Sequence, residues 1–270
     1  YAKVFSREHA ESVRALSQLA QALAAQGRYE ESLQMLDERR RAVNAKPGPD
    51  SRLALHRLLA RQLEVALLHG DLEAAGRLIE PTRASLADVA AERERGPAII
   101  AEARWHQLSG RPEAAAKVLD AWLMKLSPEQ MAQPFVQRAR LTRAEAEIAL
   151  GRHDRARPLM EQALQDMHRN GGTRNWTFRR GLELTAVQTA AQGHAAEAWL
   201  QLEKAQREAD LATIRAPSRI EHAESLLRRA TVLTAAGRMA DAAALQAPLR
   251  EALQGQHPNS PRRVWSTVTP

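Results

Sequence analysis

A glycine recurs about every 42 residues along this chain, followed each time by a small residue and then by a larger one. The six glycines are Gly27, Gly70, Gly110, Gly151, Gly193 and Gly237. They lie 43, 40, 41, 42 and 44 residues apart. A fixed period of this length is typical of a solenoid, in which each unit buries its apolar face only by stacking on its neighbours. The repeat therefore predicts one elongated domain, although 270 residues would ordinarily form one or two globular domains.

Three further positions keep a fixed distance from each glycine and predict what one unit contains. Seven residues before the glycine stand Ala20, Leu63, Ala103, Ala144, Ala186 and Ala230. Five residues after it stand Ser32, Ala75, Ala115, Ala156, Ala198 and Ala242, and nine after it Leu36, Ile79, Leu119, Met160, Leu202 and Gln246. Small residues allow two helices to approach closely, and the glycine ends the first helix and turns the chain back. We therefore expect an all-α fold of about six helix–turn–helix units.

The turn at Gly27–Ser32 has the pattern G-R-Y-x-E-S, and with the small residues on both helices it resembles the tetratricopeptide repeat (TPR). The usual unit is about 34 residues, so these longer units resemble the kinesin-light-chain type of about 42 residues that is appended to bacterial signalling proteins. The prolines and polar residues at 47–50 and 256–259 resemble the linkers of that type. The resemblance covers about residues 6–254 and implies a right-handed α–α superhelix over residues 1–254. Residues 255–270 would form a C-terminal tail or a partial repeat.

Two features depart from the regular pattern. Repeat four has Arg140, Arg143 and Glu147 where apolar residues are expected, so its first helix is predicted to be rotated or lengthened. Pro81 and Pro248 each stand eleven residues after a repeat glycine, and we expect them to kink the second helices of repeats two and six.

Composition and motifs argue against catalysis in this segment. The chain has no cysteine, which excludes disulfides, thiolate nucleophiles and cysteine-bound metals. No two of its nine histidines have the spacing of a metal motif such as H-E-x-x-H, and no phosphate-binding glycine loop is present. We therefore expect no catalytic, metal or cofactor site. The net charge is +7, but 32 acidic residues are mixed among 39 basic ones, so direct nucleic-acid binding is the less favoured class.

The positions 13, 9 and 6 residues before each glycine share one helix face, and the first helix of each unit lines the groove in solenoids of this kind. Four of the six residues at the first position are arginines. The candidate groove residues are Arg14, Gln18, Gln21, Arg57, Arg61, Glu64, Arg104, Arg138, Glu145 and Arg180. Arginine suits carboxylates and phosphates, so the hypothesis is a groove for an acidic or C-terminal peptide. The alternative is that arginine is simply the commonest polar residue here and a favourable helix former.

A second candidate surface is the segment 171–181, where two aromatic residues alternate with arginines. Arg174, Trp176 and Phe178 could form an interface rim, or a stacking site for single-stranded nucleic acid. The structural alternative is that Thr173 caps the first helix of repeat five while Trp176 and Phe178 pack on repeat four.

The sequence therefore predicts a non-catalytic domain that binds a protein or peptide. The resemblance implies the sensory or regulatory region of a bacterial transmembrane serine/threonine protein kinase. The alternative is a partner- or peptide-binding region of a transcriptional regulator. No run of 18 apolar residues is present, so we expect no membrane insertion by this segment. The chain starts at Tyr1, which suggests a segment of a longer or processed protein, and the periplasmic side of a membrane-anchored parent is slightly preferred over the cytoplasm. Leu245, Leu249 and Leu253 are a candidate homodimer contact or a face covered by the tail.

Overall fold

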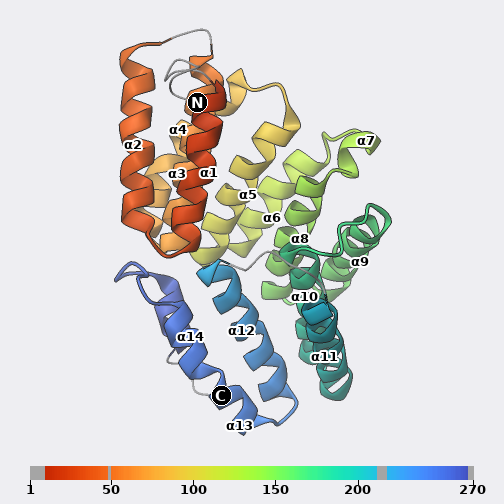
Figure 1. The fold of residues 1–270 in the computed structure, drawn as a ribbon. Coiled ribbons are helices and arrows are strands. Elements are labelled where there is room, and N and C mark those ends of the chain that lie inside the picture. Colours follow the sequence, from red (N-terminus) through yellow and green to blue (C-terminus); the bar gives the residue numbers. More distant parts are fainter. Residues whose placement is uncertain (1–9, 48–49, 212–217, 267–270) are drawn as a thin grey trace. The chain divides into compact units, whose positions relative to one another are not determined.

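The computed structural model describes residues 10–47, 50–211 and 218–266, and the secondary structure within these ranges is helical throughout (Figure 1). The helices follow one another in pairs, one pair for each predicted repeat. The pairs are α1 (Ala10–Ala25) and α2 (Tyr29–Ala45); α3 (Ser51–His69) and α4 (Leu72–Ser85); α5 (Glu92–Leu108) and α6 (Pro112–Leu123); α8 (Pro134–Ala149) and α9 (His153–Arg169); α10 (Trp176–Ala191) and α11 (Ala195–Leu211); and α12 (Arg219–Ala235) with α13 (Met239–Ala244) and α14 (Gln246–Ala252). Short elements at Leu86–Asp88, at Pro128–Met131 (α7) and at Pro261–Ser266 complete the described chain. The prediction of an all-α fold is confirmed.

Each repeat glycine lies between the two helices of its pair and has a positive φ, from 70° at Gly237 to 87° at Gly193. Side chains with a Cβ rarely adopt this conformation, which reverses the chain within a few residues. At Gly70 the backbone N–H donates to the carbonyls of Ala66 and Leu67, and this satisfies acceptors at the end of α3. The periodic glycines are therefore the residues that make the repeated turn.

The small residues five positions after the glycines are buried, as the pattern predicts. They are Ser32, Ala75, Ala115, Ala156, Ala198 and Ala242, with exposures of 0 or 1%. In repeat one the hydroxyl of Ser32 donates to the carbonyl of Ala20 at 2.8 Å, so two of the predicted positions meet directly. Such a short approach leaves no room for a larger side chain.

The chain divides into two compact units. Unit 1 comprises residues 1–110 and 255–261, and unit 2 comprises residues 111–254 and 262–270. In unit 1, α3 packs against α1, α2, α4 and α5, with Leu63, Leu67 and Ile79 in the core. In unit 2, α8 packs on α6, α9 and α10, and α10 in turn packs on α11 and α12. The single domain ending at residue 254 stays a prediction.

Helix α8 of repeat four is not lengthened, because it has 16 residues, as α1 and α10 do. Its unexpected charges are paired inside unit 2. Arg140 is 3% exposed and donates to Asp166 at 2.5 Å, while Arg143 donates to Asp120 and to the buried Glu147. Pairing therefore accounts for charged residues at positions where the repeat pattern calls for apolar ones.

The two prolines act differently. The second helix of repeat six is divided into α13 and α14, and α13 ends at Ala244. Ala244 is four residues before Pro248, whose ring clashes with that carbonyl and whose nitrogen cannot donate to it. Helix α4, by contrast, continues through Pro81 to Ser85.

The apolar face proposed as a homodimer contact is largely covered. Leu249 and Leu253 are buried and Leu245 is half-buried. Among the described helices, none combines the length and the apolar character that crossing a membrane requires.

Candidate functional site

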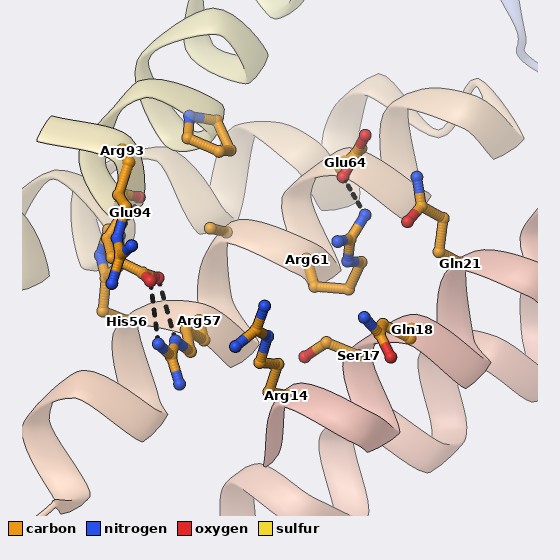
Figure 2. Close-up of a pocket in the computed structure, with 12 residues that line it drawn as sticks. Arg14, Ser17, Gln18, Gln21, His56, Arg57, Arg61, Glu64, Arg93 and Glu94 are labelled. Carbon is orange, nitrogen blue, oxygen red and sulfur yellow. Dashed lines mark hydrogen bonds and ion pairs between the residues drawn. The ribbon is translucent and has the colours of Figure 1, made fainter. Parts of the chain in front are cut away.

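A cavity of about 340 Å³ opens in unit 1 between the first helices of repeats one, two and three, α1, α3 and α5 (Figure 2). Six of the ten predicted groove residues line it, namely Arg14, Gln18, Gln21, Arg57, Arg61 and Glu64. The remaining lining residues are Ser17, His56, Ala60, Arg93, Glu94 and Pro97. The residues 13, 9 and 6 positions before Gly27 and Gly70 thus all line the same cavity.

Two arginines in the cavity wall are held by carboxylates of unit 1. Arg57 donates to Glu94 through Nε at 2.9 Å and through Nη2 at 2.8 Å, and the two side chains are only 15% and 22% exposed. The hydrogen bond from Arg57 holds the pKa of Glu94 below its usual value. Arg61 pairs with Glu64 one turn further along α3. These pairs fix the guanidinium groups in the wall (Figure 2).

Positive charge exceeds negative charge in the cavity. Four arginines and two glutamates line it, which leaves a formal excess of two positive charges. Arg14 on α1 and Arg93 on α5 are the exposed members of this set. A concave surface with one sign of charge attracts ligands of the opposite sign.

Two buried polar atoms of the cavity wall have no hydrogen-bond partner among the described residues. They are the hydroxyl of Ser17, whose residue is 7% exposed, and Nε of Arg61. A buried donor without an acceptor costs about 1–3 kcal/mol, and such groups are uncommon in folded proteins.

His56 is a wall residue that sequence reasoning missed, since it occupies none of the three groove positions. Its Nε2 contacts the carbonyl of Glu94 and its Nδ1 contacts the Ser85 hydroxyl, each at 2.9 Å. Burial lowers the pKa of His56, so its ring is neutral at physiological pH. Its contacts hold α5 against α3 and thereby place Glu94 beside Arg57.

Two of the three predicted groove residues of unit 2, Glu145 and Arg180, belong to a charge network rather than to this cavity. Arg180 donates to Glu145 at 2.5 and 3.1 Å, and Arg228 lies 3.4 Å from Glu145. Arg179 and Arg228 each pair at 2.9 Å with Glu183, which is 1% exposed. We call these five residues the Glu183 network.

The Glu183 network links the first helices of repeats four, five and six. Arg179 and Glu183 were not predicted, although their i, i+4 spacing was a signal for the pair. Arg138 on α8 and Arg104 on α5 are half-buried and do not line the cavity.

The rim segment has a different cap from the predicted one. Asn175, not Thr173, caps α10, and its Oδ1 accepts from the backbone N–H of Phe178 at 2.9 Å. Phe178 packs against a core cluster that includes Met160 of α9, as the structural alternative expected. The Arg179 guanidinium lies 4.6 Å from the ring centre of Trp176, and Arg174 is exposed.

Comparisons with known proteins identify the fold class. No family model matches the chain. No curated protein sequence matches it either. Among solved structures, BtubC (BKLC) from P. vanneervenii is similar with a TM-score of 0.59 and 16% identity, over 92% of this chain and 94% of that one. A kinesin light chain with nearly identical TPR-like repeats from Podosopora anserina is similar with a TM-score of 0.53 and 21% identity, over 74% of this chain and 96% of that one. A single-residue variant of that protein gives a TM-score of 0.54 at 20% identity, over the same shares.

At these identities the likeness defines the fold alone. The chain has a TPR-like helical repeat fold, which is the fold that the predicted resemblance implies.

Proposed function

We propose that this chain is a protein-binding repeat domain, and that the unit 1 cavity binds a peptide segment carrying carboxylates. The observation that carries the proposal is the lining of the cavity, in which four arginines stand against two glutamates and leave an excess of positive charge. Helical repeat folds typically serve as extended binding scaffolds rather than as enzymes.

The chemistry of the wall suits a carboxylate better than a neutral group. A guanidinium group offers a planar fork of donors that can bind both oxygens of a carboxylate. Glu94 and Glu64 pair with Arg57 and Arg61 and keep them oriented, and the four arginines together exceed the two glutamates by two positive charges. The cavity volume lies at the lower end of the range typical of ligand pockets. It accommodates a short peptide segment rather than a folded domain.

The test uses a fluorescein-labelled peptide of alternating glutamate and alanine, and fluorescence anisotropy as the readout. The reference probe has glutamine in place of glutamate. We expect the acidic probe to bind more tightly, and its affinity to fall with added salt. The double variant Arg14→Gln/Arg93→Gln should weaken binding by about tenfold or more, which corresponds to about 1.4 kcal/mol.

The matched control is Arg28→Gln/Arg77→Gln, which removes the same charge from exposed ion pairs at the start of α2 and on α4, outside the cavity lining. It should bind the acidic probe as the unchanged protein does. Equal losses in both double variants would refute the cavity as the site, because net charge alone would then explain binding. Equal affinity for the two probes would refute carboxylate recognition. Circular dichroism confirms that each variant keeps its helices.

For the parent protein, we propose the regulatory region of a bacterial membrane-anchored serine/threonine kinase. The support is the resemblance of the 42-residue unit to repeats appended to such proteins. A regulatory region of a transcriptional regulator is the second candidate. Sequencing the coding region beyond both ends distinguishes them, because kinase motifs such as H-R-D and D-F-G favour the first, and a helix-turn-helix favours the second.

A further inference from the structure

The segment Gly255–Pro261 belongs to unit 1, although α1–α5 of that unit end before residue 110. Its residues bind the C-terminal end of α3. The side-chain amide of Gln256 donates to the carbonyl of Leu68 at 2.7 Å, and the backbone N–H of His257 donates to the carbonyl of His69 at 2.8 Å. Gln256 and Ser260 are 8% and 4% exposed, so the segment is packed rather than loosely attached.

Gly70 is the position where the segment approaches the turn most closely. A Cβ at Gly70 would lie 2.5 Å from Cβ of Ser260 and closer still to its hydroxyl. At the repeat glycine Gly193, which has nearly the same φ, a Cβ would meet no atom within 4 Å. The turn at Gly70 therefore differs from the turn at Gly193, because residues 255–261 pack on it.

Two histidine rings meet at this contact. The ring of His69, which is 8% exposed, stacks on Tyr29 with centroids 5.1 Å apart, and the ring of His257 packs edge-on against it at 5.3 Å. Nδ1 of His257 lies 3.3 Å from the backbone N–H of Asn259 and accepts from it, which requires that nitrogen to carry no proton. The docked segment thus encloses the His69 ring between Tyr29 and His257.

We propose that Gly255–Pro261 is a pH-sensitive latch, which stays docked on the turn end of the first two hairpins while His69 is neutral and is released when His69 is protonated. Protonation would place a charge on the buried His69 ring, which is held between Tyr29 and His257. The latch is independent of the proposed peptide site, since its residues do not line the cavity.

Some of the groups around His69 lower its pKa and others raise it. Burial and the nearby His257 lower the pKa of His69, while Asp71 of the α3–α4 turn and Glu30 of α2 oppose this shift. Oδ2 of Asp71 also lies 3.7 Å from Nε2 of His257, while Oδ1 of Asp71 accepts from the N–H of Ala74 as the cap of α4. The balance at His69 favours the neutral form.

The sign of the pH effect follows from this balance. His69 binds a proton more weakly when the segment is docked than when it is released, where its pKa approaches the ordinary value of 6.5. Docking is therefore fully stabilised above that pH and weakens as the pH falls below it.

Hydrogen–deuterium exchange of the peptide covering residues 255–261 tests the latch in the full chain. Rates at about pH 7.5 and about pH 5.5 are each divided by the rate of the free peptide at the same pH, which removes the chemical pH dependence. We expect protection to be up to about tenfold lower at the acidic pH, the change that one pKa unit produces. His69→Phe keeps the ring contacts without titrating, so its protection should be equal at the two pH values. His194→Phe, at an exposed histidine of unit 2, should behave like the unchanged protein.

A second pair of variants keeps the inference testable even where His69→Phe does not fold. Gly70→Ala should abolish protection of the segment at both pH values, because its Cβ overlaps Ser260. Gly193→Ala carries the same strain at a φ of 87° and should leave the segment protected. The latch is overturned by protection that is equal at the two pH values in the unchanged protein, or by a pH dependence that persists in His69→Phe. Equal exchange in the two glycine variants would overturn its docking site.

Discussion

At the scale of single residues, Glu183 shows how this fold tolerates a charge in its interior. Burial alone would raise the pKa of its carboxyl, but Arg228, the hydroxyl of Ser225 and Arg179 together lower it. The carboxylate therefore stays ionised, and its contribution to stability is lost as the pH falls through its lowered pKa. Removing one partner of such a buried ion pair strongly lowers the stability of the fold, because the remaining charge is left buried without compensation.

Glu183→Ala should lower the free energy of unfolding by about 3–5 kcal/mol, because Arg179 and Arg228 would keep their charges without that partner. Urea denaturation followed by circular dichroism measures the change. The control is Glu31→Ala, whose pair with Arg28 is more than half exposed, and it should cost about 1 kcal/mol or less. Similar losses in the two variants would mean that the Glu183 network contributes no more than a surface pair.

The periodic residues could be predicted because each unit repeats the same steric demand. A glycine at the turn and an alanine or serine at the helix crossing are required in every unit, so they recur at fixed distances. The partner of Arg57 could not be predicted in this way. Glu94 is 37 residues away on α5, and the contact depends on how one repeat docks on the next. Six of the twelve cavity residues were therefore accessible from the sequence, while the ion pair between Arg57 and Glu94 was not.

At the scale of the helix, the start of α10 illustrates why caps are harder to place than turns. Both Thr173 and Asn175 are residue types that cap helices. The Asn175 side chain accepts from the N–H of Phe178 and also donates to the carbonyl of Gly172 at 2.5 Å, so the preceding Gly-Gly turn selects it. That choice depends on backbone geometry that residue type alone does not encode.

Asn175→Ala should destabilise unit 2 by about 1 kcal/mol through loss of the cap of α10. Thr173→Ala is the matched control, and we expect it to change the unfolding free energy by less than about 0.5 kcal/mol. Thermal denaturation of both variants measures the difference. The reverse order would restore Thr173 as the cap.

At the scale of the whole molecule, stability in a repeat protein is close to a sum of terms between neighbouring units. In unit 2, α10 packs on α8, α9, α11 and α12, so repeat five contacts repeats four and six. Damage to repeat five should therefore spread to these neighbours before it reaches more distant helices.

In Glu183→Ala, we expect faster hydrogen exchange in α8, α10 and α12, while α1 to α4 of unit 1 keep the exchange of the unchanged protein. Mass spectrometry of peptides from each helix resolves the two groups. A uniform acceleration over all helices would contradict this and would mean that the chain opens as one cooperative structure.

The hydrogen bond from Gln256 to Leu68 also determines when unit 1 can complete its folding during synthesis. The two residues are 188 positions apart in the chain. A ribosome adds about 5–20 residues per second, so the first hairpins wait about 10–40 s after their own synthesis for the segment that packs on them. The end of α3 thus reaches its last native contacts well after its own synthesis, and during that interval it is open to chaperones or to another nascent chain.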